Sequence, residues 1–186
     1  QGGRELGLRF DLTVPLARFM AMNPMLKMPF KRYEVGQVFR DGPVRLGRYR
    51  EFWQCDIDTI GSSSMVADAE IVAVMNTVFQ KLNIDIVIKI NNRKVLNGIL
   101  EQAGITEKGD KEKAIITIDK LDKIGKEGVS KELQERGFSK KQVDNIFTLV
   151  KENISLAELK KKLTNTEGTQ GIQKLEELFS YLQAMN

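Results

Sequence analysis

Two strand-patterned segments on either side of a short loop constrain this chain more than any other feature. Residues 32–40 and 48–58 both alternate apolar with polar or charged side chains, which is the period of a β-strand. The stretch between them, residues 41–47, contains two glycines and a proline, a composition typical of a turn. Because the two segments are so close in the chain, they predict an antiparallel hairpin with one apolar face and one polar face.

The alternation predicts that the apolar face of this hairpin packs on the core. Its members are Tyr33, Val35, Phe39, Tyr49, Trp53, Cys55 and Ile57. Residues 5–11 alternate in the same way, with Leu6, Leu8 and Phe10 on one side, and predict a third strand.

The polar faces of these three segments are rich in arginine and amide groups. They hold Arg9, Arg40, Arg48, Arg50, Phe52, Gln54 and Asp58. A guanidinium is permanently charged and can bind two oxygens at once, which suits a polyphosphate, and Phe52 is placed to stack on a planar base. The alternative is an arginine-rich, solvated face held by surface ion pairs, and local reasoning leaves both open.

The remainder of the chain reads mainly as helices. A helix is expected over residues 13–22, and another over residues 65–82, followed by a short buried strand at Ile84–Ile90. The second of these helices is expected to bury Val72, Met75, Val78, Phe79 and Leu82. Beyond residue 92 the pattern predicts short helices at 95–102, 111–123, 129–136, 141–152 and 156–163, and a final helical stripe from Ile172 to Leu182.

The expected fold class is therefore α+β, with part of an antiparallel sheet flanked by helices in residues 1–91 and a small all-helical domain in residues 92–186. Both ends of the chain look like cuts through a longer protein, because a patterned strand begins at residue 5 and a helical stripe runs almost to the last residue.

Composition excludes several classes of function. The chain has no histidine, which excludes Ser-His-Asp or Cys-His catalysis and zinc sites built on histidine pairs within it. The single cysteine, Cys55, excludes an internal disulfide and suits a reducing cytoplasm. No apolar run approaches the ~18 residues of a membrane span, so no membrane association is expected. A net charge of +4 permits phosphate ligands or RNA without indicating them.

Four stretches resemble one family, the class II aminoacyl-tRNA synthetases in their histidyl form. KRYEVGQVFRDGPVRLGRYREFWQCDIDTIG (residues 31–61) resembles the second signature motif of the class, and LGLRFDLTVPLARF (residues 6–19) resembles the strand of the histidine and ATP pocket. INNRKVLNGIL (residues 90–100) and IDKLDKIG (residues 118–125) resemble parts of the helical insertion domain. The resemblance implies a class II synthetase-type sheet and a ligase that joins histidine to tRNA(His).

The resemblance also implies roles for particular residues. Arg40 would be the catalytic arginine, bridging the α-phosphate of ATP and the histidine carboxylate; Arg48 would meet the outer phosphates, Phe52 would stack on adenine and Asp41 would complete the ATP-binding set. For histidine, the implied binding residues are Asp11, Thr13, Gln54 and Asp58. ATP would be a substrate with Mg²⁺ on its phosphates, and no metal ligands can be named from the chain.

Several properties of the longer protein follow from the same resemblance. It implies a cytoplasmic homodimer whose helical domain leans on the acceptor arm of tRNA(His), while this chain alone is inactive because half of the pocket is missing. Lys140–Lys141 and Lys160–Lys162 would face RNA phosphates, or form an ordinary solvated helix face. The alternatives are a non-catalytic regulatory subunit of ATP phosphoribosyltransferase, a tRNA-sensing domain attached to a kinase, and a module that binds RNA through the helices alone.

Overall fold

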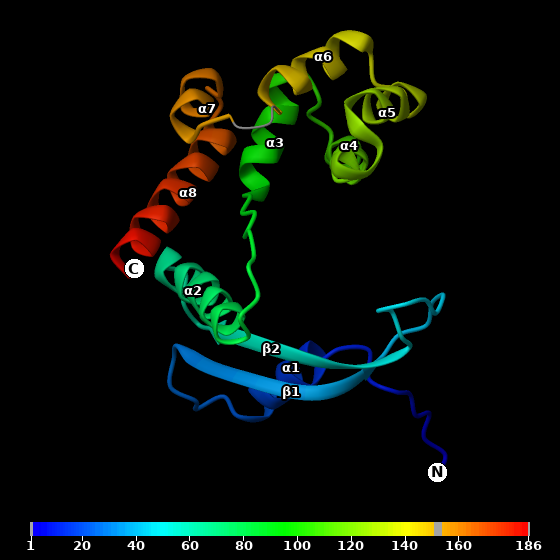
Figure 1. Ribbon diagram of the computed structural model, residues 1–186, viewed down its shortest axis with the longest axis vertical. Helices are drawn as coiled ribbons and strands as arrows, with labels where there is room; N and C mark the ends of the chain where they lie inside the picture. Colours follow the sequence, from blue (N-terminus) through cyan, green and yellow to red (C-terminus); the bar gives the residue numbers. More distant parts are fainter. Residues whose placement is uncertain (1, 151–153, 186) are drawn as a thin grey trace. The chain divides into compact units, whose positions relative to one another are not determined.

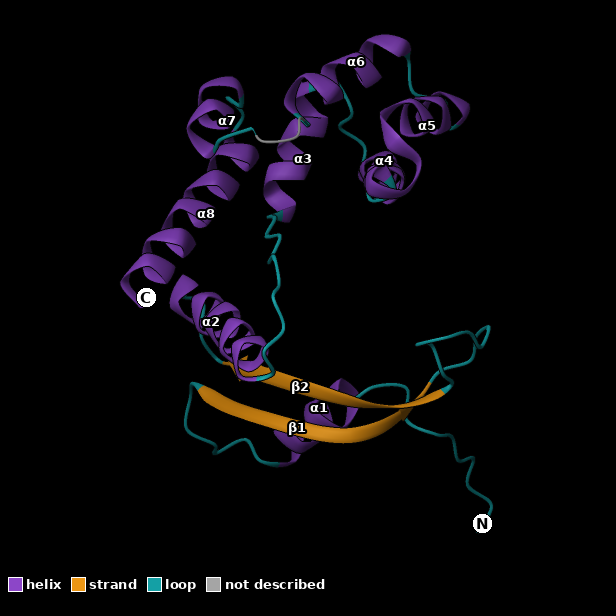
Figure 2. Ribbon diagram, in the orientation of Figure 1, coloured by secondary structure: helices purple, strands orange, loops and turns teal. Residues whose placement is uncertain are grey.

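The computed structural model describes residues 2–150 and 154–185. In this part of the chain two strands and eight helices follow one another in the order α1, β1, β2, α2 and then α3 to α8 (Figures 1 and 2). The fold is α+β, as the sequence predicts. The chain separates into two compact units, residues 1–75 and 76–186, and the domain boundary expected after residue 91 stays a prediction.

The first unit is built on an antiparallel hairpin. Its elements are α1 (Thr13–Met22), β1 (Phe30–Phe39), β2 (Glu51–Ile60) and the beginning of α2 (Met65–Lys81). The register pairs Val38 with Phe52 and Arg32 with Asp58, so that residues two apart along each strand share a face. The hairpin and α1 therefore form where the sequence predicts them, within about two residues at each end of the helix and the first strand.

Leu12 fastens the segment before α1 to the hairpin. Its side chain is fully buried, and it lies against Gly36 of β1. A β-carbon at position 36 would stand 3.2 Å from the Cδ2 atom of Leu12, which is closer than ordinary van der Waals contact. Glycine thus allows residues 11–13 to approach the sheet closely, on the face that carries its polar side chains.

The predicted burial of the two hairpin faces is wrong for this chain. Tyr33 is 82% exposed, Trp53 65% and Val35 55%, although they belong to the apolar face. The polar face is the half-buried one, because the segment around Leu12 lies on it. A sheet face becomes buried only when another layer packs on it, and the described residues leave most of the apolar face uncovered.

Two predicted strands are absent from the described chain for a related reason. Residues 5–11 make one ladder-like hydrogen bond, from the Phe39 amide to the Arg9 carbonyl oxygen (2.9 Å), and are otherwise irregular. Residues 84–90 are extended but pair with no strand in the part of the chain that the structure describes, and Val87 is 89% exposed. An alternating pattern makes a strand only where a neighbouring strand receives its hydrogen bonds.

The apolar stripe of α2 is likewise not buried as predicted. Met75, Val78 and Leu82 are 40%, 44% and 60% exposed, whereas the buried residues of this helix, Met65 and Ala69, lie in its first turns. The helix forms at the predicted place because its composition favours helix, but its burial depends on a partner that the sequence pattern does not name.

The second unit is helical. Its complete helices are α3 (Arg93–Gln102), α4 (Lys108–Ile118), α5 (Leu121–Glu135), α6 (Lys140–Leu149), α7 (Leu156–Lys162) and α8 (Thr166–Met185). The helix predicted over 111–123 is divided, since α4 ends at Ile118 and α5 begins at Leu121. Gly125 produces a kink inside α5, with φ of +67°. The end of the predicted helix 141–152 lies outside the described residues.

Side-chain caps explain where three of these helices begin. The Asn92 side chain accepts a hydrogen bond from the Lys94 amide at the start of α3 (2.9 Å). Ser139 and Gln142 form a reciprocal capping box at the start of α6, and Ser155 caps α7. Each cap satisfies backbone N–H groups that have no partner within the helix, so the boundary is a local property of the sequence.

The core of the helical unit is centred on the contact between α3 and α8. Gly98 of α3 and Gly168 of α8 meet backbone to backbone, and a β-carbon added at Gly98 would stand 2.5 Å from the Gly168 Cα atom. The Asn165 side chain connects the two helices at this crossing. Its Nδ2 donates to the Gly98 carbonyl oxygen (2.6 Å), and its Oδ1 accepts from the Gly168 backbone amide (2.8 Å). The fully buried side chains of this unit include Leu100, Leu133, Ile146, Leu163 and Ile172. No helix in the described chain is both long and apolar enough to cross a membrane.

A polar cluster joins α3, α4 and α8 beside this core. The ammonium of Lys111, whose side chain is 12% exposed, donates to Glu101 (2.5 Å) and lies 3.6 Å from Glu167. The hydrogen bond to Glu101 raises the pKa of Lys111 above its usual 10.5. The hydrogen bond from the Asn97 amide (2.7 Å), with the charge of Lys111, lowers the pKa of Glu167 below its usual 4.5.

These shifts predict how the stability of the helical unit depends on pH. Glu167 has a lower pKa in the folded state, so its stabilisation is complete above pH 4.5 and is lost as the pH falls through the folded-state value. Lys111 has a raised pKa, so its stabilisation is complete below pH 10.5 and is lost as the pH rises through the folded-state value. At neutral pH, Glu167→Gln is expected to lower the thermal midpoint by about 2–4 °C, for a loss of roughly 1 kcal/mol.

The measurement is thermal unfolding of the wild type and of Glu167→Gln at neutral and at acidic pH, followed by circular dichroism. The difference between them should shrink as the pH falls below 4.5, because Glu167 then becomes protonated in both states of the wild type. Glu112→Gln, at an exposed position of α4, is the matched control and should show a small effect at every pH. A constant difference between wild type and Glu167→Gln would contradict the assignment.

Candidate functional site

The loop that joins the two strands forms one side of a cavity in the first unit. Its tip is a tight turn in which Arg45 and Arg48 exchange backbone hydrogen bonds of 2.8 and 3.1 Å, with Gly47 at φ of +73° between them. The exposed Arg50 side chain stabilises the loop, because its Nε donates to the Gly42 carbonyl oxygen (3.1 Å). The turn therefore carries Arg48 back toward the base of the hairpin.

The cavity has a volume of about 340 Å³ and contains all four residues expected at the nucleotide. Its lining residues are Arg40, Asp41, Gly42, Pro43, Gly47, Arg48, Tyr49 and Phe52. This volume is within the range of small-molecule sites, about 300–1,000 Å³. Two arginines and two aromatic side chains in one hollow can bind a phosphate chain and a base.

Arg40 is the most highly connected side chain of this cavity. Its Nη2 donates to the Gln54 side-chain oxygen (3.0 Å) and its Nε to the Phe10 carbonyl oxygen (3.3 Å). The guanidinium also lies 4.7 Å from the centre of the Phe10 ring and 5.1 Å from that of Phe52. These contacts hold a permanent positive charge at the edge of the cavity in a defined orientation.

Acidic side chains occupy the other end of the same sheet face. Gln54 accepts from Arg40 and donates to Asp56 (2.7 Å), so the amide stands between the cationic and the acidic groups. Farther along, Glu34 and Asp58 flank Arg32, whose Nε donates to Asp58 Oδ2 (3.0 Å). The face is thus polarised along the strands, with arginines at the loop end and carboxylates at the other.

Asp11 and Thr13 lie at the start of α1, on either side of the buried Leu12. Asp11 Oδ1 accepts from the Thr13 amide (3.1 Å) and the Val14 amide (3.3 Å), while Thr13 is exposed on the first turn. The Leu12 carbonyl oxygen accepts from Arg32 Nη2 (3.1 Å), which ties this segment to the acidic end of the sheet. Asp11, Thr13, Gln54 and Asp58, the residues expected to bind histidine, therefore belong to one compact region.

Sequence reasoning did not assign a role to Arg32 or Phe10. The alternation of residues 32–40 places Arg32 on the polar face, and the hairpin register sets it directly opposite Asp58, which is a usable signal. The alternation of residues 5–11 places Phe10 on an apolar face, whereas the residue is 62% exposed and its ring lies against Arg40. The path of residues 9–12 across the sheet, which depends on tertiary structure, decides the contact of Phe10 with Arg40 and that of the Leu12 carbonyl with Arg32.

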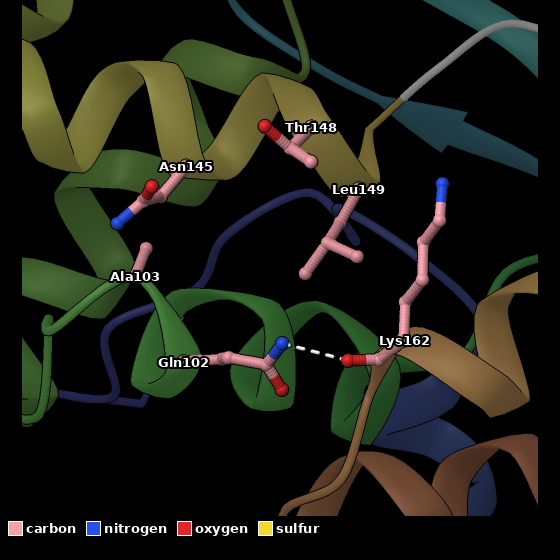
Figure 3. Close-up of a pocket in the computed structure, with 6 residues that line it drawn as sticks. All are labelled: Gln102, Ala103, Asn145, Thr148, Leu149 and Lys162. Carbon is pink, nitrogen blue, oxygen red and sulfur yellow. Dashed lines mark hydrogen bonds between the residues drawn. The ribbon is translucent and has the colours of Figure 1, made fainter.

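A second cavity, of about 360 Å³, lies in the helical unit between the ends of α3, α6 and α7 (Figure 3). On one side of this cavity, Gln102 donates a hydrogen bond to the Lys162 carbonyl oxygen (2.7 Å), and Asn145 and Thr148 project from α6. Lys162 is the one basic side chain among the six described residues that line it, and its ammonium is paired with Glu158 (2.6 Å). This cavity therefore lacks the group of free cations that a phosphate site requires.

The lysine run of α7 is partly neutralised as well. Lys160 pairs with Glu176 of α8 (2.8 Å) and Lys162 with Glu158. These pairs favour the interpretation of the run as a solvated helix face, in agreement with the alternative that the sequence leaves open. Lys140 and Lys141, at the start of α6, are exposed.

Comparison with known proteins decides the family. The family model described as histidyl-tRNA synthetase matches residues 1–186. A histidine–tRNA ligase of Bacillus cereus is 46% identical over 187 residues, covering 100% of this chain and 44% of that protein.

The chain belongs to the histidyl-tRNA synthetase family.

Further relatives agree with this assignment. A histidine–tRNA ligase of Helicobacter pylori is 45% identical over 97% of this chain and 43% of its own length. The crystal structure of histidyl-tRNA synthetase from Nostoc sp. superposes with a TM-score of 0.83 at 35% identity, over 95% of this chain and 42% of that one. This chain thus spans less than half the length of the relatives that it matches.

The fold is shared more widely within this group. A Bacillus halodurans structure described as an ATP phosphoribosyltransferase regulatory subunit/histidyl-tRNA synthetase superposes with a TM-score of 0.73 at 18% identity. At that identity the match shows the common fold alone.

Proposed function

We propose that this chain forms part of the ATP- and histidine-binding region of a histidine–tRNA ligase, and that it requires the rest of such a protein for activity. The full-length protein would activate histidine with ATP to histidyl-adenylate and transfer it to tRNA(His). The observation that carries the proposal is the polarity of the hairpin face, with arginines around a nucleotide-sized cavity at one end and carboxylates at the other. Arg40 and Gln54 join the two ends through a direct hydrogen bond.

The proposed reaction suits a site without histidine. The substrate carboxylate is already a nucleophile: one of its oxygens attacks the α-phosphorus of ATP, the bond from that phosphorus to the bridging oxygen breaks, and pyrophosphate leaves. No protein base is needed, and the site must chiefly orient the two substrates and offset negative charge in the transition state. Arg40 would bridge the α-phosphate and the carboxylate, and its contacts with Gln54, Phe10 and Phe52 would orient it beforehand.

The remaining cavity residues would bind the nucleotide. Arg48, on the loop tip, would meet the outer phosphates, and Phe52 would stack on adenine. Asp41, whose side chain is 98% exposed, would border the base. The described residues form no group of three acidic, histidine or cysteine side chains that could hold a metal ion. Mg²⁺ would accompany the phosphates of ATP.

The acidic end of the face would bind histidine. Asp11 and Thr13 would take the α-amino group with help from Gln54, and Asp58 would accept a hydrogen bond from the imidazole. A buried acceptor that needs an N–H partner rejects amino acids that lack one, which gives specificity at this position.

The wider proposal concerns the whole protein. The helical unit would contact the acceptor arm of tRNA(His), with the exposed Lys140 and Lys141 as candidate phosphate contacts, and the protein would be a cytoplasmic homodimer. The family supports histidine, ATP and tRNA as partners of the complete protein.

The test is histidine-dependent exchange of pyrophosphate into ATP, measured for a full-length protein that contains this chain and for residues 1–186 alone. We expect exchange by the full-length protein and none by the shorter chain, because that chain carries less than half of a relative's length. If a folded full-length protein shows no exchange, the ligase proposal fails and a regulatory role of the same fold becomes the better explanation.

A further inference from the structure

One guanidinium connects three separate chain segments at the acidic end of the site. Arg32 of β1 donates its Nε to Asp58 Oδ2 on β2 (3.0 Å) and its Nη2 to the Leu12 carbonyl oxygen (3.1 Å). Its Nη1 is paired with Glu34, two residues along its own strand. The Arg32 side chain is 15% exposed, whereas Asp58 and Glu34 are about twice as accessible, at 29% and 31%.

This arrangement differs from an ordinary surface ion pair. An exposed pair contributes little, because two mobile side chains must be ordered in a high-dielectric surrounding. Here the arginine is largely covered, and all three of its nitrogens have acceptors in fixed positions. The planar fork of arginine can connect such divergent acceptors, whereas the single nitrogen of lysine cannot reach them all.

The identity of the groups that accept hydrogen bonds from Arg32 connects this residue to the proposed histidine subsite. Asp58 is the proposed imidazole-binding carboxylate, and Leu12 lies between Asp11 and Thr13, the proposed amino-group ligands. Arg32 therefore joins the two halves of the proposed histidine subsite, which come from chain segments more than forty residues apart. The Nε of Arg32 donates to Oδ2 of Asp58, so that Oδ1 of Asp58 can accept a hydrogen bond from the substrate.

From this geometry we infer that Arg32 is a positioning residue for histidine: it sets the orientation of Asp58 and the distance from Asp58 to residues 11–13. The inference rests on the proposed function. Arg32 is not among the residues that line the nucleotide cavity, and its polar contacts are with Leu12, Glu34 and Asp58. Its replacement should therefore change KM for histidine and leave KM for ATP nearly unchanged.

The experiment uses the full-length protein and measures KM for histidine, KM for ATP and kcat in pyrophosphate exchange. Arg32→Gln is expected to raise KM for histidine by about 10–100-fold and to leave KM for ATP within about twofold of the wild type. Arg32→Lys keeps the charge but loses the fork, so a smaller rise, on the order of 5–20-fold, is expected. A general loss of structure would move both KM values or the amount of folded protein.

Lys31→Gln is the matched control. Lys31 is the neighbouring residue on β1, points to the opposite side and forms an exposed ion pair with Glu70 (2.6 Å). Its replacement also removes a cation from the same strand, but we expect both KM values to stay within about twofold of the wild type.

A double-mutant cycle with Asp58→Asn tests whether Arg32 acts through Asp58. The rise in KM for histidine should be clearly smaller when Arg32→Gln is introduced into Asp58→Asn than into the wild type, because the shared contact is already lost. If Arg32→Gln fails to fold, Arg32→Lys carries the test. An unchanged KM for histidine in the folded Arg32→Lys protein, or equal changes for ATP and histidine, would overturn the inference, while active wild-type exchange would leave the proposed function intact.

Discussion

Replacing Arg40 by alanine in a full-length protein is expected to lower the rate of histidine-dependent pyrophosphate exchange by about 10³-fold. The adenylation transition state carries negative charge on the α-phosphate and the attacking carboxylate, and Arg40 is the guanidinium held between the nucleotide cavity and Gln54. Its loss removes an interaction that strengthens as that charge develops, so kcat and kcat/KM should fall together.

The comparison that isolates this effect uses two further variants. Arg40→Lys restores one charge without the two-pronged geometry and should recover only a minor part of the activity. Arg18→Ala removes an exposed arginine from α1 of the same unit and should leave exchange near the wild-type rate. Near-normal exchange by Arg40→Ala, in a protein with an unchanged thermal midpoint, would contradict the site assignment.

Replacing Gly98 by alanine is expected to destabilise the helical unit by about 3 kcal/mol, which corresponds to a fall of roughly 6–12 °C in its thermal midpoint. The added β-carbon would stand 2.5 Å from the Gly168 Cα atom and 2.7 Å from the Asn165 side-chain oxygen. The nearest obstacle is backbone, so α3 and α8 must move apart, and the hydrogen bond from Asn165 to Gly98 is disturbed with them.

Helix propensity acts in the opposite direction, which makes this a decisive test. Alanine is favoured over glycine within a helix by about 1 kcal/mol, so the crowding must exceed that gain to destabilise the protein. Gly109→Ala, in α4, is the control: a β-carbon there meets nothing within 4 Å, and the change should be neutral or slightly stabilising. Similar thermal midpoints for Gly98→Ala and the wild type would show that the two helices do not pack as closely as described.

Much of the local structure could be predicted from short stretches of sequence. The hairpin, α1 and the starts of α6 and α7 depend on alternation, turn residues and capping side chains that act over a few positions. The grouping of Arg40, Arg48 and Phe52 could also be predicted from sequence, because the register and loop of the hairpin bring them to one cavity. Their role in ATP binding stays a proposal.

The burial of each face could not be predicted in this way. Alternation distinguishes the two faces of a strand but does not say which layer covers them, so Tyr33 and Trp53 are exposed although their pattern indicates a core. The same limit applies to residues 5–11 and 84–90, whose patterns need neighbouring strands before they become strands themselves.

The sequence by itself determined the hairpin, the places of most helices and the family to which the chain belongs. Only the tertiary structure decided that Leu12 lies over Gly36, that Arg32 reaches both Asp58 and the Leu12 carbonyl, and that Gly98 meets Gly168. The physical reason is the separation along the chain of the residues that interact. Caps, turns and strand alternation involve residues a few positions apart, whereas these contacts join residues 20 to 70 positions apart and exist only once the chain has packed.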